Sequence, residues 1–153
     1  MIQTVPSLAL FGFLLPLPFI GGVGKRTAIV ALILYAMLPL LSNAVTGILS
    51  VDRGIHESAV ALGMNDRQIL WGVELPLAFP TILAGVRIAT VTTIGTATIA
   101  AAIGGGGLGV FVFRGIATAD TTTLLAGAVP AALMAIVADE VLGWVERRVS
   151  YWQ

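Results

Sequence analysis

The chain has 153 residues, of which 58% are hydrophobic and 10% are charged, and its mean hydropathy is +1.00. A soluble domain carries about a quarter charged residues, so this composition indicates a membrane protein. Eight basic and eight acidic residues cancel, which leaves no bulk field to attract nucleic acid, and the lack of cysteine excludes disulfides and thiolate metal sites.

Four apolar stretches are long enough to cross a bilayer, for which about 20 residues suffice. None alternates polar and apolar residues, so the predicted fold is an all-α, polytopic membrane helical bundle and not a barrel. The chain is expected to form a single transmembrane domain over residues 1–153. Its predicted spans are residues 2–22, 27–49, 77–103 and 121–145.

The first span begins directly after Met1, without the basic region or the small-residue cleavage site of a signal peptide. It contains Pro6, Pro16 and Pro18, and each proline frees backbone groups that neighbouring helices must satisfy. We therefore expect that the chain lacks an upstream helix.

Basic residues predict the orientation, because cytoplasmic loops of membrane proteins carry an excess of Lys and Arg. The side that holds the 50–76 loop has five of them and the opposite side has three. These are Arg53, Arg67, Arg87, Arg147 and Arg148 against Lys25, Arg26 and Arg114. The bias places the loop and both termini in the cytoplasm of a multi-pass cell-membrane protein.

The loop between the second and third spans is longer than a plain connection requires. Asp52 is a good N-cap, and Gly63 lies where a helix ends in the left-handed conformation. Asn65 and Gln68 form a capping box that starts a second helix, which Pro76 is expected to end. The sequence predicts two amphipathic helices joined by a glycine turn outside the bilayer, each too short to be stable alone.

This loop resembles the EAA loop of ABC-transporter permeases of the type I importer class. The positions that match at the motif's spacing are Glu57, Ser58, Ala59, Gly63, Val73, Leu75 and Pro76. Ser58 replaces the motif's usual Ala and Val73 its usual Ile, and both keep the size class. In that family the loop couples the permease to a separate cytoplasmic ATPase. The resemblance therefore implies that Ile55, Ala59 and Leu62 form the apolar core of that contact, within a charged rim.

An amphipathic helix pair that rests on the membrane surface is the alternative for this loop, although such helices carry more Lys and Arg on the polar face. A membrane scaffold or a small intramembrane enzyme with such a loop would be a protein of a different class. Retention of an ATPase subunit distinguishes a permease from both.

Three further stretches are most similar to osmoprotectant permeases, which import glycine betaine, carnitine, choline and related amines. They are IQTVPSLALFGFLLP, IGTATIAAAIGGGGLG and FRGIATADTTTLLAGAVPAALMAIVADEVLGWVERR. The resemblance covers essentially the whole chain, without the family's first core helix. It implies a cytoplasmic ATPase, an extracytoplasmic substrate-binding protein and a second permease subunit, identical or paralogous, within the lipid membrane. Methionine-type permeases share the EAA loop, so methionine or another small organic solute is the alternative.

One face of the third span carries small residues: Gly85, Ala89, Thr92 and Thr96 at helical spacing, with Thr93 beside them. Small residues let helices approach closely, and threonine can bond its own backbone, which favours a packing face. The rival interpretation is a translocation path for a polar solute, lined by Thr92, Thr93 and Thr96.

Charged residues inside the spans also allow two interpretations. Arg87 lies ten residues past Leu77, about 15 Å along a helix. Intramembrane charges point to function by default, but arginine can also extend to the cytoplasmic interface. Asp139 and Glu140 lie near the end of the fourth span, beside Trp144, and we expect them at the interface.

Five glycines follow the third span: Gly104, Gly105, Gly106, Gly107 and Gly109. They fit the dinucleotide pattern formally, but no strand precedes them and no acidic residue stands at the required distance. The pattern predicts a helix stop and a flexible turn, and the family resemblance implies an extracytoplasmic gate.

The sequence offers no catalytic site. His56 and Glu57 begin like a zinc-protease motif, but Val60 occupies the position of its second histidine. With one histidine and no cysteine, a catalytic metal site is not expected, nor is a cofactor. The chain is predicted not to be an enzyme, and ATP hydrolysis would belong to its partner.

Overall fold

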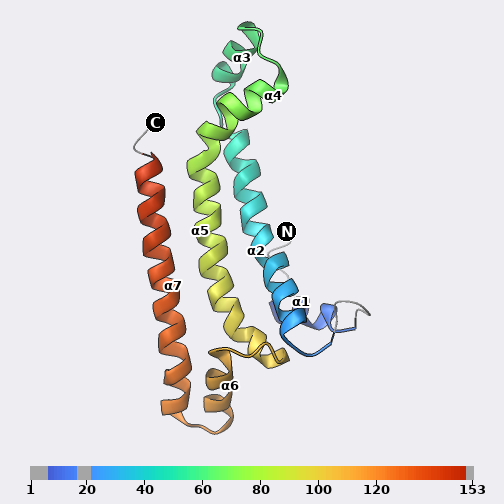
Figure 1. Ribbon diagram of the computed structural model, residues 1–153, viewed down its shortest axis with the longest axis vertical. Coiled ribbons are helices and arrows are strands. Elements are labelled where there is room, and N and C mark those ends of the chain that lie inside the picture. The colour runs from blue at the N-terminus through green and yellow to red at the C-terminus, as the bar shows by residue number, and fades with distance from the viewer. Residues whose placement is uncertain (1–6, 17–21, 151–153) are drawn as a thin grey trace.

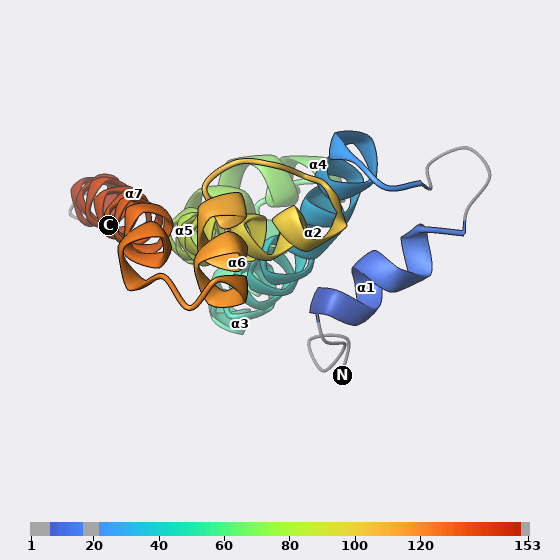
Figure 2. The ribbon, with the colours of Figure 1, turned by 90° about the horizontal axis from the view of Figure 1, so that it is seen from below.

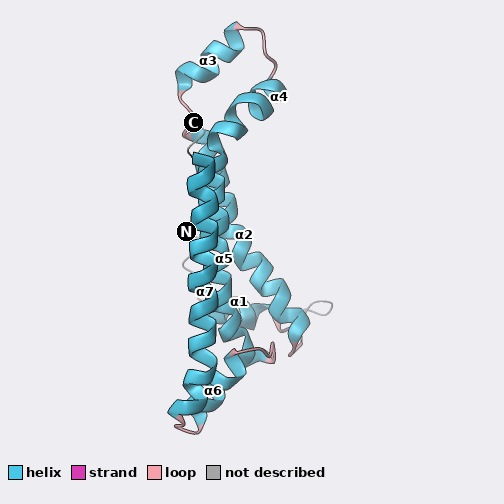
Figure 3. Cartoon of the chain, turned by 60° about the vertical axis from the view of Figure 1, so that its left-hand side comes forward, coloured by secondary structure: helices cyan, strands magenta, loops and turns pink. Residues whose placement is uncertain are grey.

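The computed structural model describes residues 7–16 and 22–150, and every regular element within these ranges is a helix (Figure 3). This agrees with the predicted all-α class.

Three long helices lie side by side and form the body of the molecule (Figure 1). They are α2 (Lys25–Leu49), α5 (Leu75–Ile99) and α7 (Thr121–Ser150). Seen from below, α7, α5 and α2 follow one another in a row, and the short α1 (Ser7–Leu14) lies beyond α2 (Figure 2). The central helix α5 therefore packs against both of its long neighbours.

The described residues contain three helices that are long and apolar enough to cross a membrane, where the sequence predicts four spans. They are Lys25–Leu49, Asp66–Ile103 and Thr121–Arg148. The first predicted span, residues 2–22, is described only in part, and its described helix α1 has 8 residues. A fourth span therefore stays a prediction.

Little of the apolar surface is buried within the chain itself. A small cluster of buried apolar residues lies where α1, α2 and the end of α5 meet: Leu14, Ala28, Ala31 and Ala100. In the most apolar window of α7, only 6% of the residues are buried. The remaining apolar surface needs lipid or another subunit to cover it.

The loop between α2 and α5 begins with a capped helix, α3 (Arg53–Ala61). The Asp52 carboxylate accepts from the Gly54 N–H at 2.7 Å, as the predicted N-cap requires. At the other end Gly63 has φ 80°, its N–H bonds the Val60 carbonyl, and the Met64 N–H bonds the Ala59 carbonyl. These two bonds form a Schellman motif, so the predicted left-handed glycine is confirmed.

The second loop helix, α4 (Asp66–Ile69), begins with the predicted capping box. The Asn65 side chain accepts from the Gln68 N–H at 3.0 Å, and the Gln68 side chain accepts from the Asn65 N–H at 2.9 Å. Both bonds satisfy donors that a helix start leaves free.

The prediction that Pro76 ends this helix is wrong. The chain passes from α4 through a π-helical segment, Leu70–Glu74, directly into α5, so that one helical path runs from Asp66 to Ile103. In the π-helical segment the Leu75 N–H bonds the Leu70 carbonyl, five residues back. Pro76 then lies at the start of α5, directly after the π-helical segment, whose wider turn changes the backbone bonding pattern at the point where Pro76 has no N–H to donate. The loop as predicted, residues 50–76, therefore includes the beginning of the long helix.

The opposite end of the molecule contains a short helix that the sequence did not predict. A 3-10 segment, Ala100–Ile103, extends α5 and ends at Gly104, which is left-handed with φ 80°. After the glycines, α6 (Gly109–Ala117) packs beside α7 (Figure 1). Asp120 then caps α7 by accepting from the Thr122 N–H and from the Thr123 hydroxyl, and these bonds lower the pKa of its carboxyl.

Candidate functional site

Three large apolar side chains of α3 and its C-terminal end are exposed at the far end of the molecule. Ile55 is 42% exposed, Val60 53% and Leu62 82%. Figure 1 shows that α3 lies beyond the ends of α2 and α5, away from the three-helix layer. Exposed apolar residues gathered on a protruding element are typical of an interaction surface.

The predicted contact face of Ile55, Ala59 and Leu62 needs one correction. Ala59 is only 4% exposed, because α3 packs against α4 and the π-helical segment and the Ala59 side chain lies on the covered side. Val60, which the sequence pattern did not single out, is exposed instead. The apolar side chains that another protein can reach are therefore Ile55 and Leu62, which share one face of α3, and Val60, which lies about 140° away around the helix.

Exposed charged side chains also lie on α3 and α4. Arg53 and Glu57 form an ion pair at 3.6 Å with side chains that are 93% and 71% exposed. Such an exposed pair one helical turn apart adds little to stability, so both groups remain accessible to a partner. Asp66 and Arg67 on α4 are exposed as well.

A contact between His56 and Glu74 fixes α3 to the beginning of the long helix. The His56 Nδ1 lies 2.9 Å from the Glu74 Oε1, and the Glu74 side chain is 18% exposed. The two residues are 18 positions apart, and no local pattern in the sequence indicates that they meet. The fold of the loop brings them together.

The remaining positions of the loop motif lie in two places. The Ser58 hydroxyl donates to the Gly54 carbonyl within α3 at 2.6 Å. Val73, Leu75 and Pro76 lie where the π-helical segment joins α5. The motif therefore covers both the protruding helix and its joint with the long helix.

The three threonines predicted to line a path on α5 do not share one cavity. Thr92 is exposed and lines the grooves on either side of α5 on one face of the layer. Thr93 lines a cavity with Lys25, Ala28 and the glycine turn, and Thr96 is buried. A helix turns by about 100° per residue, so neighbouring threonines point to different sides.

Helix packing explains most of this small-residue face. Gly85, Ala89 and Thr96 are buried. A Cβ on Gly85 would lie 2.6 Å from the Asn43 Cβ, so α2 approaches α5 more closely than any larger residue would allow. The threonine hydroxyls bond their own helix, as expected: those of Thr92 and Thr96 donate to the carbonyls of Ile88 and Thr92. Thr92 is the exposed member of the three and faces open grooves.

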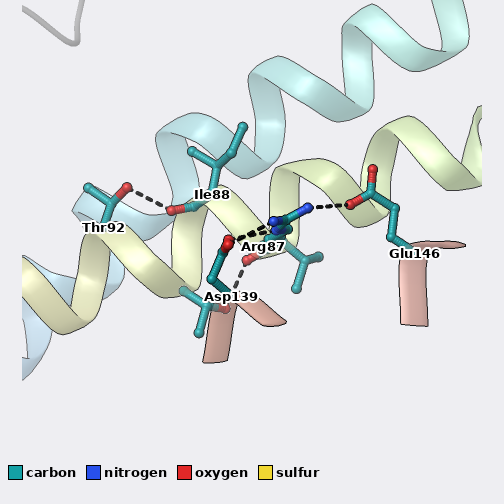
Figure 4. A network of polar contacts seen from close by, with 7 residues as sticks. Arg87, Ile88, Thr92, Asp139 and Glu146 are labelled. Carbon is teal, nitrogen blue, oxygen red and sulfur yellow. Dashed lines mark hydrogen bonds and ion pairs between the residues drawn. The ribbon is translucent and has the colours of Figure 1, made fainter. Parts of the chain in front are cut away.

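Arg87 bridges α5 to α7, a contact that the sequence did not predict (Figure 4). Its Nε and Nη2 donate to the two oxygens of Asp139 at 2.6 and 2.7 Å, and its Nη1 donates to Glu146 at 3.3 Å. The carboxylate of Asp139 faces Arg87, and its expected position at the membrane interface near Trp144 stays a prediction. The sequence shows an arginine and two acids, and only helix packing reveals which ones meet.

The five predicted gate glycines form a folded turn, and four of them, Gly105, Gly106, Gly107 and Gly109, line a cavity of about 480 Å³. Gly104, Gly106 and Gly107 have φ values of 80°, 76° and 75°. A Cβ on Gly109 would collide with the Thr98 carbonyl of α5. The turn is thus held by close contact with the end of α5.

Comparison with known proteins identifies the family. The profile of the family described as "Binding-protein-dependent transport system inner membrane component" matches residues 1–151. The carnitine transport permease protein OpuCD of Listeria monocytogenes is 47% identical over 97% of this chain. The glycine betaine/carnitine/choline transport system permease protein OpuCD of Bacillus subtilis is also 47% identical over 97% of this chain. The chain spans 66% and 64% of the lengths of these two relatives.

A solved structure has the same fold. It is described as an inward facing conformation of the MetNI methionine ABC transporter, and it matches with a TM-score of 0.84 at 23% identity. The match covers 96% of this chain and 70% of that chain. Because the family profile matches nearly the whole sequence, the chain belongs to the binding-protein-dependent transport system inner membrane components.

Proposed function

We propose that the chain is the membrane-spanning permease subunit of an ABC importer, and that its solute is an osmoprotectant such as glycine betaine, carnitine or choline. The family membership and the 47% identity to permeases named for these solutes support the proposal. ATP hydrolysis takes place in a separate subunit, and the permease is not itself an enzyme.

The observation that carries the coupling role is the exposed apolar surface of α3. Ile55 and Leu62 share one exposed face of α3, Val60 is exposed on another side of the helix, and exposed charged side chains lie on the same helix and on α4. An apolar centre with a polar rim is the usual anatomy of a protein interface, in which the rim charges orient the partner. The partner that fits is the cytoplasmic ATPase subunit, so the loop lies in the cytoplasm.

The helical path behind α3 supports a mechanical role for this contact. α4 continues through the π-helical segment into α5, and the His56–Glu74 contact fixes α3 to that path. A displacement of α3 by the ATPase therefore acts on α5 through the turn at Gly63 and through the His56–Glu74 contact. The motif positions Val73, Leu75 and Pro76 lie at this joint.

The assembly has three further components. A second permease subunit, identical or paralogous, and membrane lipid cover the apolar sides that the chain leaves exposed. An extracytoplasmic binding protein delivers the solute to the opposite end, where Gly104–Gly107 and Gly109 act as part of a gate. Thr92, on the open grooves beside α5, is the threonine best placed to meet the solute.

The proposal is tested with the assembled complex of this chain, its ATPase and its binding protein in lipid vesicles. We expect ATP-dependent uptake of radiolabelled glycine betaine. We also expect that Leu62→Arg abolishes retention of the ATPase, because it places a charge on the apolar face that Leu62 shares with Ile55, while Leu62 is 82% exposed and free of core packing.

The matched control is Ile116→Arg, which changes a 61% exposed apolar residue of a short helix at the opposite end. It should retain the ATPase. Full retention by Leu62→Arg would contradict the docking role of α3.

Methionine is the second candidate solute, because the fold matches the MetNI methionine transporter. Competition separates the two candidates. Unlabelled choline and carnitine should reduce glycine betaine uptake while methionine does not, and the reverse pattern would assign the chain to methionine import.

A further inference from the structure

The residues of α7 that surround Arg87 are spaced so that they lie on one face of that helix. Asp139, Gly143 and Glu146 occupy positions i, i+4 and i+7 of α7, which lie on one face of a helix. The guanidinium of Arg87 lies over this face, between the two carboxylates (Figure 4). We call the three α7 residues the Arg87 socket.

The hydrogen bonds that Arg87 makes require a guanidinium group. Two parallel hydrogen bonds to Asp139 use one edge of the group, and the third bond reaches Glu146, which lies about 10 Å further along α7 at 1.5 Å per residue. A lysine is a point charge on a flexible stem and cannot hold both carboxylates in this way.

Gly143 provides the space that the guanidinium occupies. A Cβ at this position would lie 3.0 Å from both Cζ and Nη1 of Arg87, closer than ordinary van der Waals contact. The Arg87 side chain is 32% exposed, towards a groove of about 350 Å³ between the two helices. A larger residue at 143 would therefore push the guanidinium out of the socket and into this groove.

Arg87 also lies on the helical path that begins at the loop. The path from Asp66 to Ile103 includes Arg87 near its middle, whereas α7 has no direct connection along the chain to α3 or α4. A movement that enters through the loop reaches α7 through the packing of α7 on α5 and, at the far end, through α6, and the Arg87 socket is a polar part of the direct packing on α5.

We propose that Arg87 is a positioning residue of the transport cycle, which holds α7 on α5 so that both helices move together when the ATPase displaces the loop. This inference rests on the proposed transport function. It goes beyond that function because it assigns the step at which loop movement is passed to the last helix.

The test compares variants that empty the socket in different ways. Gly143→Leu displaces the guanidinium and leaves every charge in place, whereas Arg87→Met removes the positive charge and leaves the carboxylates of Asp139 and Glu146 without it. Gly95→Leu is the matched control, because Gly95 lies within α5 and a Cβ added there would meet nothing within 4 Å. The pair Arg87→Glu with Asp139→Arg restores opposite charges across the same helices.

Two measurements are made on each complex. The first is the amount of solute imported per ATP hydrolysed. The second is the distance distribution between spin labels on cysteines introduced at Leu77 in α5 and Val141 in α7, both exposed, in a chain without native cysteine.

We expect Gly143→Leu and Arg87→Met to keep binding-protein-stimulated ATP hydrolysis but to import less solute per ATP, with a broadened distance distribution. Gly95→Leu should match the parent, and the charge exchange should recover part of the loss. If the contact between Arg87 and α7 only stabilised the fold, its loss would lower ATP hydrolysis and solute import together. That result, or a parent-like import ratio and distance in both socket variants, would overturn the proposal.

Failure of the proposed function gives a different result. If the parent complex imports no solute, the spin-label distances still report whether Arg87 holds α7 on α5. A variant that does not assemble is replaced by Arg87→Lys, which keeps the charge and should broaden the distribution less than Arg87→Met.

Discussion

At the scale of single residues, Gly63 sets the direction of the protruding helix. Its φ of 80° is a conformation that a β-branched residue adopts only at a cost of about 1–3 kcal/mol. Nothing lies within 4 Å of an added Cβ, so the cost arises from the backbone alone. We expect Gly63→Val to reach the membrane in normal amounts but to lose binding-protein-stimulated ATP hydrolysis, measured per assembled complex.

Gly63→Asn separates backbone conformation from side-chain size. Asparagine enters the left-handed region more readily than other residues, so this variant should keep most of the stimulated activity, with Gly63→Ala between the two. Parent-like coupling in Gly63→Val would show that the Schellman turn does not transmit the movement.

Residues whose roles depend on near neighbours were predictable from the sequence. The cap at Asp52, the turn at Gly63 and the capping box at Asn65 each involve groups within five positions along the chain. The burial of Ala59 and the pairing of Arg87 with α7 could not be predicted in this way, because both depend on tertiary packing. No periodicity distinguishes a covered alanine from an exposed one on the same short helix.

At the scale of elements, the π-helical segment Leu70–Glu74 sets the rotation of the loop about α5. A π-turn holds one residue more than the α-helix around it, and each residue corresponds to about 100° of rotation. We expect deletion of Gly72 to convert the segment to α-helix and to rotate α3 and α4 by about that angle. The His56–Glu74 contact would then be lost, and with it the stimulated ATP hydrolysis.

Gly72→Ala is the control for this deletion, because it keeps the length of the segment and would add a Cβ at an ordinary 3.7 Å from the Met64 methyl carbon. It should couple normally. Normal coupling in the deletion variant would show that the loop tolerates rotation and that the π-turn has no transmitting role.

Hydropathy located the long helices well, because 27–49, 77–103 and 121–145 all lie within observed helices. Hydropathy and local propensity failed where the neighbouring backbone or tertiary packing determines whether a segment is helical. Pro76 was expected to break a helix, yet the π-helical turn before it changes the backbone bonding pattern, and the helical path continues through it. The nine residues of α6 begin at a glycine and form a helix packed on α7, which short-range propensity does not predict.

At the scale of the whole molecule, the two ends of the layer should lie in different compartments. Cysteines at Asn65 and Gly106 can be labelled singly, since the chain has none of its own. We expect a membrane-impermeant maleimide to reach Gly106→Cys in intact cells and Asn65→Cys only after the membrane is opened. Trp71 and Trp144, both largely exposed, are of the type that anchors at a membrane interface.

The reverse labelling pattern would place the loop in the compartment without ATP, and the coupling role of α3 would be untenable. Labelling of both sites from outside would instead show that the two ends are not separated by a bilayer.

The hydroxyl bonds of α5 also determine which chemical groups its surface can offer. Thr90, Thr92, Thr93, Thr96 and Thr98 each donate their proton to a carbonyl of their own helix. Thr92, the member of this set that faces open grooves, therefore presents lone pairs and no proton to those grooves. Lone pairs attract the partly positive methyl groups of a quaternary amine but give a carboxylate no donor. A zwitterion in contact with Thr92 would be held weakly by its cationic end alone, which suits passage better than capture.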